Sequence, residues 1–315
     1  MNICNTNPKL KELNLSSNHL SGQIPNGLGQ CIKLQVISLS YNEFTGSIPR
    51  GIGELVELQR LSLQNNSLTG TLFLFFFIFP SYSFTFPQAF KDVSIALMFF
   101  QPTHFNCVAG EMPHSLFNIS SLKFLNLEVN NLKGEIPSTL SHCRELQKLS
   151  LSFNQFTGRI PEAIGSLSNL EGLYLGYNKL AGGIPKEMGN LRNLNILSLT
   201  SSGLSGPIPT EIFNISSLQE IYLSNNSFSG SLPMDICEHL PNLKGLYLAI
   251  NQLSGQLPAT ISLCRQLLSL SLFYNKFTGS TPREIGNLSK LEQIYLGRNS
   301  FTGTIPPSFG NLTAL

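Results

Sequence analysis

The chain lacks an excess of either charge. Its 315 residues include 20 lysines and arginines against 18 aspartates and glutamates, so the formal net charge is +2. No segment presents a basic face, and recognition of nucleic acid depends on such a face because phosphate contacts dominate affinity. The sequence therefore predicts no nucleic acid partner.

Motifs for catalysis are also missing. There is no glycine-rich phosphate loop followed by a kinase lysine, and neither an HRD nor a DFG triplet occurs. The five histidines share no metal-ligand spacing: His19, His104, His114, His142 and His239. Five acidic residues expected to face outward are spread over distant segments: Glu12, Glu128, Glu171, Glu220 and Glu292. We therefore expect no enzymatic activity, no metal site and no cofactor.

Long apolar runs are absent as well. The run Leu72–Phe79 has eight residues, whereas a transmembrane helix needs about 20. No positively charged segment followed by an apolar run stands at the amino terminus, as a signal peptide requires. We expect that this chain does not insert into a membrane by itself and carries no signal peptide.

The sequence does contain one 24-residue motif, LxxLxLxxNxLxGxIPxxIGxLxx, over almost its whole length. Eleven copies begin at Leu10, Leu34, Leu58, Leu122, Leu146, Leu170, Leu194, Leu218, Leu243, Leu267 and Leu291, and the copy at Leu218 has one extra residue. Residues 1–9 match the tail of a truncated preceding repeat, 10–70 hold repeats 1 to 3, 71–110 interrupt the third, and 111–315 hold the remainder of repeat 3 and repeats 4 to 11. The predicted architecture is a single repeat solenoid.

Each part of the motif has a physical role. The leucines on either side of the single x in LxL point to one face, as in a short strand, and eleven such strands at about 4.8 Å spacing would form one parallel sheet about 50 Å long. The asparagine after each strand can bond turn backbone groups, and we expect a ladder of Asn18, Asn42, Asn66, Asn130, Asn154, Asn178, Asn226, Asn251, Asn275 and Asn299. Ser202 replaces the asparagine once and should form a weaker rung.

These copies of LxGxIP within a leucine-rich repeat make the chain resemble the extracellular region of plant leucine-rich repeat receptor-like serine/threonine kinases. The phrases LFNISSL (Leu116–Leu122) and EIGNLSKL (Glu284–Leu291) are most similar to the subfamily of immune receptors for bacterial peptides. The resemblance implies an α/β-type leucine-rich repeat superhelix with one parallel concave sheet and an irregular or 3-10 convex side. It also implies a role in signalling or defence, a peptide or protein ligand, a possible co-receptor kinase of the same repeat type, and a parent receptor at the extracellular face of the plasma membrane.

Residues 71–110 are unlike everything around them. They contain 11 of the 22 phenylalanines, no leucine repeat and one residue of each charge, and we expect irregular structure there. A transmembrane helix and an island domain that shapes a ligand pocket are two possible interpretations. A translated intron is the interpretation we favour, because joining Gly70 to Glu111 restores a faultless repeat and a 40-codon insertion preserves the reading frame.

The two chain ends suggest a fragment of a larger protein. Residues 1–10 align without gaps on residues 234–243, which end a long repeat, and Leu315 is the first residue of what would be a twelfth unit. We therefore expect both ends of the core to be uncapped, and solenoids normally need polar caps for solubility. A secreted inhibitor of cell-wall polygalacturonases and a splice product without function of its own remain rival interpretations.

The outward positions of the predicted strands collect aromatic residues. Seven of the eight tyrosines fall there, and rigid aromatic side chains make good anchors for a partner. The alternative is that tyrosine simply suits strands and that these are scattered surface residues. The predicted ligand-binding strip comprises Phe153, Tyr174, Tyr177, Tyr222, Tyr247, Phe273, Tyr274 and Tyr295.

Cysteines and glycosylation motifs complete the candidate sites. Cys4 with Cys31 and Cys237 with Cys264 share a spacing of 27 and could form disulfides between neighbouring turns, although small buried side chains are the simpler interpretation. Cys143 has no counterpart and should be free, and Cys107 belongs to the interrupting segment. Seven Asn-x-Ser/Thr motifs are candidate glycosylation sites: Asn14, Asn65, Asn118, Asn214, Asn225, Asn287 and Asn311.

Overall fold

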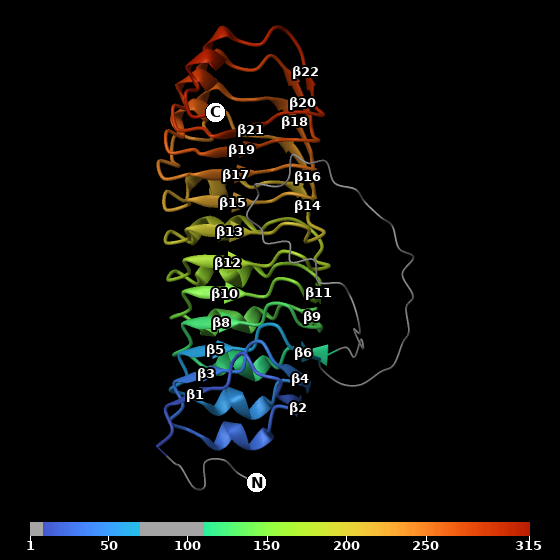
Figure 1. Ribbon diagram of the computed structural model, residues 1–315, viewed down its shortest axis with the longest axis vertical. Coiled ribbons are helices and arrows are strands. Elements are labelled where there is room, and N and C mark those ends of the chain that lie inside the picture. Colours follow the sequence, from blue (N-terminus) through green and yellow to red (C-terminus); the bar gives the residue numbers. More distant parts are fainter. Residues whose placement is uncertain (1–8, 70–109) are drawn as a thin grey trace, which may run out of the picture.

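The chain forms a solenoid in which each repeat adds one strand to a long parallel sheet. The computed structural model describes residues 9–69 and 110–315. In Figure 1 these strands are stacked from the blue end of the array to the red end. The sheet has eleven strands, in the order β1 (Glu12–Asn14), β3 (Val36–Ser38), β5 (Arg60–Ser62), β8 (Phe124–Asn126), β10 (Lys148–Ser150), β12 (Gly172–Tyr174), β13 (Ile196–Ser198), β15 (Glu220–Tyr222), β17 (Gly245–Tyr247), β19 (Ser269–Ser271) and β21 (Gln293–Tyr295). The predicted fold class is confirmed.

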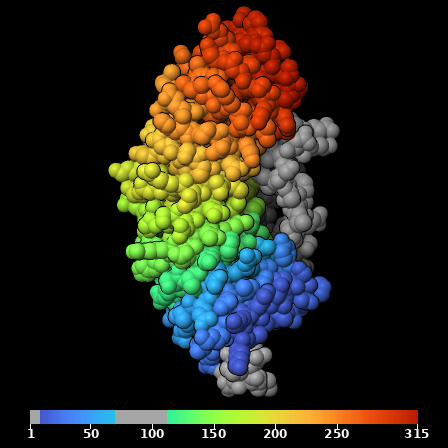
Figure 2. Space-filling view, turned by 90° about the vertical axis from the view of Figure 1, so that its left-hand side faces the viewer, coloured from blue at the N-terminus to red at the C-terminus, as the bar shows by residue number. Residues whose placement is uncertain are grey.

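The core lies directly behind this sheet. The central residue of a typical strand, such as Leu149, Leu173 or Leu197, is completely buried, while its two neighbours in the strand point the other way. Phenylalanines fill the wider part of the core, with Phe156 and Phe228 among the largest fully buried side chains. Figure 2 shows the colours succeeding one another from end to end, as expected when each repeat packs mainly on its neighbours.

A second set of short parallel strands runs along the flank of the solenoid, at the right-hand edge in Figure 1. It is divided into three sheets: β2 (Ser21–Gln23), β4 (Glu43–Gly46) and β6 (Ser67–Leu68); β7 (Gly110–Glu111), β9 (Leu132–Glu135) and β11 (Gln155–Thr157); and β14 (Ser205–Pro207), β16 (Ser227–Ser231), β18 (Gln252–Gln256), β20 (Lys276–Gly279) and β22 (Ser300–Phe301). The sequence motif alone gave no prediction of these flank sheets.

Short 3-10 helices form the side opposite the long sheet, and each follows a proline that fixes the extended entry into the turn. They are η1 (Asn26–Gln30), η2 (Arg50–Glu54), η4 (His114–Asn118), η5 (Ser138–His142), η6 (Glu162–Ser166), η7 (Lys186–Asn190), η8 (Thr210–Asn214), η9 (Ala259–Leu263), η10 (Arg283–Asn287) and η11 (Pro307–Asn311). The long repeat at Leu218 has a series of turns in place of the helix.

The array keeps its register across the interrupted third repeat. Strand β5 pairs with β8, so that Leu61 lies opposite Leu125, as predicted for adjacent repeats. On the flank, Thr69 donates to the Gly46 carbonyl, and Gly110 pairs with Leu132. Gly110 therefore occupies the position in the repeat that would follow Thr69 if the segment between them were absent. Residues 70–109, which include most of the proposed insertion, lie outside the described residues.

The asparagine ladder runs along the array where the long sheet ends. In the repeat of Asn154, the side-chain Nδ2 donates to the carbonyls of Leu127, Leu151 and Ser152, and Oδ1 accepts the Leu132 backbone N–H. Equivalent bonds recur at the other ladder asparagines, although Asn18 has only the two local ones because no described repeat precedes it. Each full rung therefore ties its own repeat to the repeat before it.

Ser202 makes fewer hydrogen bonds than the ladder asparagines. Its Oγ donates to the carbonyls of Leu175 and Leu199, so it satisfies two acceptors where an asparagine satisfies three. A hydroxyl is also too short to replace the Oδ1 that accepts a backbone N–H from the preceding repeat. The flank strands are discontinuous in the repeat before Ser202, between β11 and β14. Backbone hydrogen bonds still connect the flank there: Lys179 donates to Phe156, and Ser205 donates to Gly182.

Candidate functional site

The outward positions of the long sheet bear the predicted aromatic residues. Tyr174, Tyr222, Tyr247 and Tyr295 each end a strand and are half-buried. A second row, just before each ladder asparagine, has a left-handed backbone with φ between 51° and 58° in all eleven repeats. This conformation is uncommon for residues other than glycine. In this row lie Tyr41, Phe153, Tyr177 and Tyr274, of which Tyr41, Phe153 and Tyr274 are exposed.

Several predicted strip residues contact one another. Tyr222 and Tyr247 are paired across β15 and β17, and their rings stack in parallel with centroids 4.7 Å apart. Phe153 and Tyr177 stack at 4.2 Å between centroids. Phe273 and Tyr274 meet at a tilt, with centroids 6.3 Å apart. Three aromatic clusters therefore lie along the outer face from the repeat of β10 to the repeat of β19, rather than isolated side chains.

Two cations from the chain itself cover aromatic rings of the strip. The Lys148 ammonium lies 4.9 Å from the centroid of Tyr174, and the Arg298 guanidinium lies 5.8 Å from that of Tyr274. A cation over a tyrosine face is attracted by the ring quadrupole. Sequence reasoning did not identify Lys148 or Arg298. Their positions in the repeat could have indicated them, because each cation occupies an outward position in the repeat next to that of the tyrosine it covers.

Glycines make room for two of the tyrosine rings. The tripeptide Gly-Leu-Tyr occurs in β12 and in β17, and in both the tyrosine ring lies against the glycine two residues earlier. A β-carbon on Gly172 would come within 2.9 Å of the Tyr174 ring, and one on Gly245 would come within 2.6 Å of the Tyr247 ring. These glycines were not predicted as site residues, although the repeated tripeptide could have indicated them.

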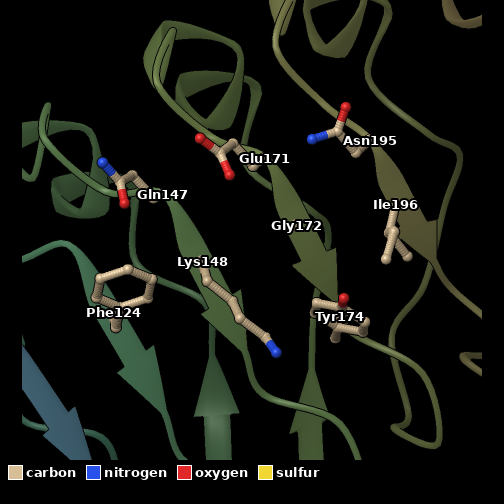
Figure 3. Close-up of a pocket in the computed structure, with 8 residues that line it drawn as sticks. All are labelled: Phe124, Gln147, Lys148, Glu171, Gly172, Tyr174, Asn195 and Ile196. Atoms are coloured by element: carbon tan, nitrogen blue, oxygen red, sulfur yellow. The ribbon is translucent and has the colours of Figure 1, made fainter. Parts of the chain in front are cut away.

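The space left beside Gly172 by its missing side chain, here called a notch, is part of a shallow cavity of about 170 Å³. In Figure 3 the polar side chains of Gln147, Glu171 and Asn195 form a row along one side, and the Lys148 ammonium reaches toward Tyr174. The cavity is lined by Phe124, Gln147, Lys148, Glu171, Gly172, Tyr174, Asn195 and Ile196. Apolar walls with a polar rim suit a single side chain of an extended ligand.

The notch at Gly245 is filled by the carboxylate of Glu220. The two residues lie opposite each other on β15 and β17, and the Glu220 Oε2 occupies the space that a β-carbon on Gly245 would need. This oxygen is shielded from solvent and has no hydrogen-bond partner. Burial raises the pKa of Glu220, while a hydrogen bond from the Tyr222 hydroxyl and the charge of Lys244 oppose the rise.

Four tyrosines of the strip remain neutral at physiological pH. Burial raises the pKa of Tyr174, Tyr177, Tyr222 and Tyr247 above the ordinary value. Nearby carboxylates add to the rise, Glu128 at Tyr174 and Glu220 at Tyr222. The rings therefore offer neutral π faces and hydroxyl donors, which suits recognition rather than proton transfer.

The cysteines form an inter-repeat link. Cys237 and Cys264 are joined in a disulfide with 5.2 Å between Cα atoms, and it ties the turns of the long repeat to the next repeat. Cys31 is also disulfide-bonded. Its expected partner, Cys4, lies outside the described residues, as does Cys107. Cys143 is a free, buried thiol, and burial raises its pKa to about 12.

The glycosylation motifs fall on two parts of the surface. Asn118, Asn214, Asn287 and Asn311 end 3-10 helices and are exposed. The other three lie on the long-sheet side: Asn14 and Asn225 are exposed and Asn65 is half-buried. Asn225 donates to Ser201 Oγ at 2.8 Å.

The described residues contain neither a candidate metal cluster nor a candidate membrane-spanning helix. Within residues 9–69 and 110–315, no group of three or more His, Cys, Asp or Glu side chains could hold a metal ion. No helix in these same ranges has the length and apolarity to cross a bilayer.

Comparison with known families identifies the repeats. Models of the leucine rich repeat match residues 8–68, 121–143, 144–204, 217–239, 266–288 and 290–312. No match was found among curated proteins.

Many solved structures are similar to this chain. The LRR ectodomain of the plant membrane receptor kinase GASSHO1/SCHENGEN3 from Arabidopsis thaliana, in complex with CASPARIAN STRIP INTEGRITY FACTOR 2, is 35% identical with a TM-score of 0.82, over 97% of this chain and 32% of that one. The plant peptide hormone receptor RGFR1 in complex with RGF2 is 35% identical with a TM-score of 0.70, over 98% and 50%. A third similar structure is the Arabidopsis receptor kinase HAESA in complex with the peptide hormone IDA and the co-receptor SERK1.

 

 In the ternary complex the identity is 26% and the TM-score 0.65, over 96% of this chain and 56% of that one. This chain thus spans less than two thirds of the length of each of these three ectodomains.

Proposed function

Because this chain belongs to the leucine-rich repeat family, we propose that it is part of the ligand-recognition ectodomain of a plant receptor-like kinase. In this proposal an extended peptide or protein segment binds along the outward face of the long sheet, over the strip from Phe153 to Tyr295. A co-receptor of the same repeat type would contact the flank. The parent receptor would act in signalling or defence at the extracellular face of the plasma membrane, with glycans on the exposed asparagine motifs.

The observation that carries the proposal is the stacked pair of Tyr222 and Tyr247. Their rings are parallel and their centroids lie 4.7 Å apart on the outward face of adjacent strands. Half-buried rings held in this way lose little conformational entropy when a partner binds, so they are good anchors. The similar plant receptors RGFR1, a peptide hormone receptor, and HAESA, solved with a peptide hormone, support a peptide as the class of ligand.

The finer assignment to immune receptors rests on the residues between the consensus positions of the repeats. The phrases at Leu116–Leu122 and Glu284–Leu291 are its basis. We retain it as a proposal about the parent receptor, whose kinase domain would supply the enzymatic activity.

An alanine scan tests the proposed strip. Peptides are first selected from a displayed random library against the full chain, and their affinities are then measured for Tyr174→Ala, Tyr222→Ala, Tyr247→Ala and Tyr295→Ala. We expect at least one of these variants to weaken binding by about tenfold or more, since aromatic anchors dominate such interfaces. Tyr41→Ala is the matched control, because Tyr41 lies on the same face but outside the strip. Unchanged affinity in all four variants would contradict the proposal.

A further inference from the structure

The carboxylate of Glu220 lacks an ion-pair partner in the described chain. The salt bridges within residues 9–69 and 110–315 join His19 to Glu43, Lys33 to Glu57 and Arg283 to Glu284. Lys244, a cation whose charge acts on Glu220, donates from its Nζ to Gln219 Oε1 at 2.9 Å instead. One oxygen of Glu220 also lacks any hydrogen-bond partner.

Aromatic rings stand beside this carboxylate. Tyr222 follows Glu220 by two residues, so both side chains leave the same face of β15. Tyr247 lies opposite Tyr222 on β17 and stacks on it. A carboxylate next to the faces of two tyrosines is a favourable environment for a cation, because both the charge and the ring quadrupoles attract it.

Other tyrosines of the strip already have a cation from the chain. Lys148 covers Tyr174 and Arg298 covers Tyr274. Across the described ranges, no cation of the chain is placed over the rings of Tyr222 or Tyr247 in the same way. The stacked pair thus offers the same kind of surface with an added negative charge and without its own cation.

We propose that Glu220, Tyr222 and Tyr247 form a subsite for a basic side chain of the peptide ligand, with arginine preferred over lysine. The preference follows because a planar guanidinium can stack on a tyrosine ring while it pairs with the carboxylate. Gly245 is part of the subsite, since the absence of its β-carbon leaves room for the carboxylate. The subsite rests on the proposed function only in requiring that the basic group belong to a peptide.

The first experiment probes the subsite without any peptide. The full chain is labelled with ¹³C at the tyrosine rings and titrated with N-acetyl-arginine amide, and N-acetyl-norleucine amide serves as the neutral control. We expect saturable shifts of the Tyr222 and Tyr247 signals with the arginine probe alone, and their loss in Glu220→Gln. Glu12→Gln is the matched control, because exposed Glu12 holds the same first position in β1 that Glu220 holds in β15 and lies outside the strip. Equal responses to both probes, or an unchanged response in Glu220→Gln, would overturn the subsite.

The second experiment uses peptides selected against the full chain. We expect the selected sequences to share a basic residue, and Glu220→Gln to weaken their binding by about tenfold. Gly245→Ala should weaken it as well, because the new β-carbon displaces the end of the Glu220 side chain. Gly172→Ala is the matched substitution in the other Gly-Leu-Tyr strand. Because no carboxylate fills the notch there, the preference of the chain for peptides with a basic residue should persist in this variant.

The outcomes separate the two proposals. Selected peptides that depend on the strip tyrosines but not on Glu220 would refute the subsite and leave the proposed function intact. Failure to select any peptide would contradict the proposed function, while the arginine titration would still decide the subsite. Thermal denaturation of each variant shows whether a loss of binding reflects unfolding.

Discussion

Arg60 lies over the ring of Phe124, with 4.6 Å between the guanidinium carbon and the ring centroid. The two residues are direct neighbours on β5 and β8, although the interrupting segment separates them in the sequence. A cation and an aromatic ring that meet in this way stabilise each other across the junction. The repeats on either side of the interruption therefore contact each other as consecutive repeats.

The first prediction concerns a chain in which residue 70 is joined directly to residue 111. We propose that residues 71–110 are a translated intron, and their removal should leave the repeat array folded. The phenylalanine-rich segment adds apolar surface, so the shortened chain should associate less. Size-exclusion chromatography measures the association, and circular dichroism measures the melting temperature. A shortened chain that fails to fold would contradict this prediction.

The same proposal has a consequence for the transcript. Sequencing reads should include a form that joins codon 70 to codon 111. If no read joins codon 70 to codon 111 at high sequencing depth, the intron interpretation is refuted, whatever the behaviour of the shortened chain.

The second prediction compares two rungs of the ladder. Asn154→Ala removes three donated bonds and one accepted bond, and we expect a loss of about 3 kcal/mol in the free energy of unfolding. Ser202→Ala removes two donated bonds and should cost about 1 kcal/mol. Urea denaturation of both variants gives the two values. Equal losses would show that the serine rung is as strong as an asparagine rung.

The third prediction concerns pH and Glu220. Its pKa is raised by burial above the model-compound value of 4.5, so the folded chain retains a proton that the unfolded chain releases. Stability contributed by this group is therefore lost as the pH rises from about 4.5 through the folded pKa. Glu220→Gln should lower the melting temperature less at about pH 7 than at about pH 4, or even raise it at the higher pH.

Glu57 provides a control of opposite sign. The side-chain hydrogen bond from Lys33 lowers its pKa, with Gln35 contributing, so its stabilising effect is present above the unfolded pKa and lost as the pH falls. Glu57→Gln should therefore have its larger effect at neutral pH, and the effect should be small because the side chain is exposed to solvent. If the effect on the melting temperature depends on pH in the same direction in both variants, the raised pKa assigned to Glu220 is contradicted.

The fourth prediction concerns the disulfide of Cys237 and Cys264. Its replacement by two serines should reduce the free energy of unfolding by about 3 kcal/mol, because the bridge closes a loop of moderate length. The turns of the long repeat should then become the first site of limited proteolysis, since they lack the 3-10 helix of the other described repeats. Thermal denaturation and mapping of the cleavage products test both expectations.

Cys143 is the corresponding control for free thiols. Burial raises its pKa to about 12, and its Sγ contacts the carbonyl of Ile119 at 3.4 Å. Alkylation at about pH 8 should therefore leave Cys143 unmodified in the folded chain and modify it after unfolding. Rapid labelling of the native protein at this residue would show that the thiol is accessible.

The periodic features of the fold were predictable because each depends on positions within one repeat. Leu149 is buried and Tyr174 faces outward for the same reason, which is the alternation of a strand. The bonds of Asn154 likewise follow from its place after the strand. Pairing of the flank strands was not predictable, because it needs a register that no single repeat contains.

The chemistry of the outward face depends on residues from neighbouring repeats. Lys148 reaches Tyr174, and Glu220 reaches the space above Gly245, only because adjacent strands bring them together. The sequence identified the tyrosines as a strip but not these partners. Side-chain direction and length decide which neighbour is contacted, and the repeat motif leaves both unspecified.

The flank of the solenoid has a mechanical consequence. Backbone hydrogen bonds that run from repeat to repeat along one edge resist bending of the stack. Where the strands are interrupted between β11 and β14, Lys179 still donates to Phe156 and Ser205 donates to Gly182. Asn131 likewise donates to Leu68 across the interrupted third repeat. We therefore expect the outward face near Tyr177 to meet a ligand as a stiff surface without a hinge.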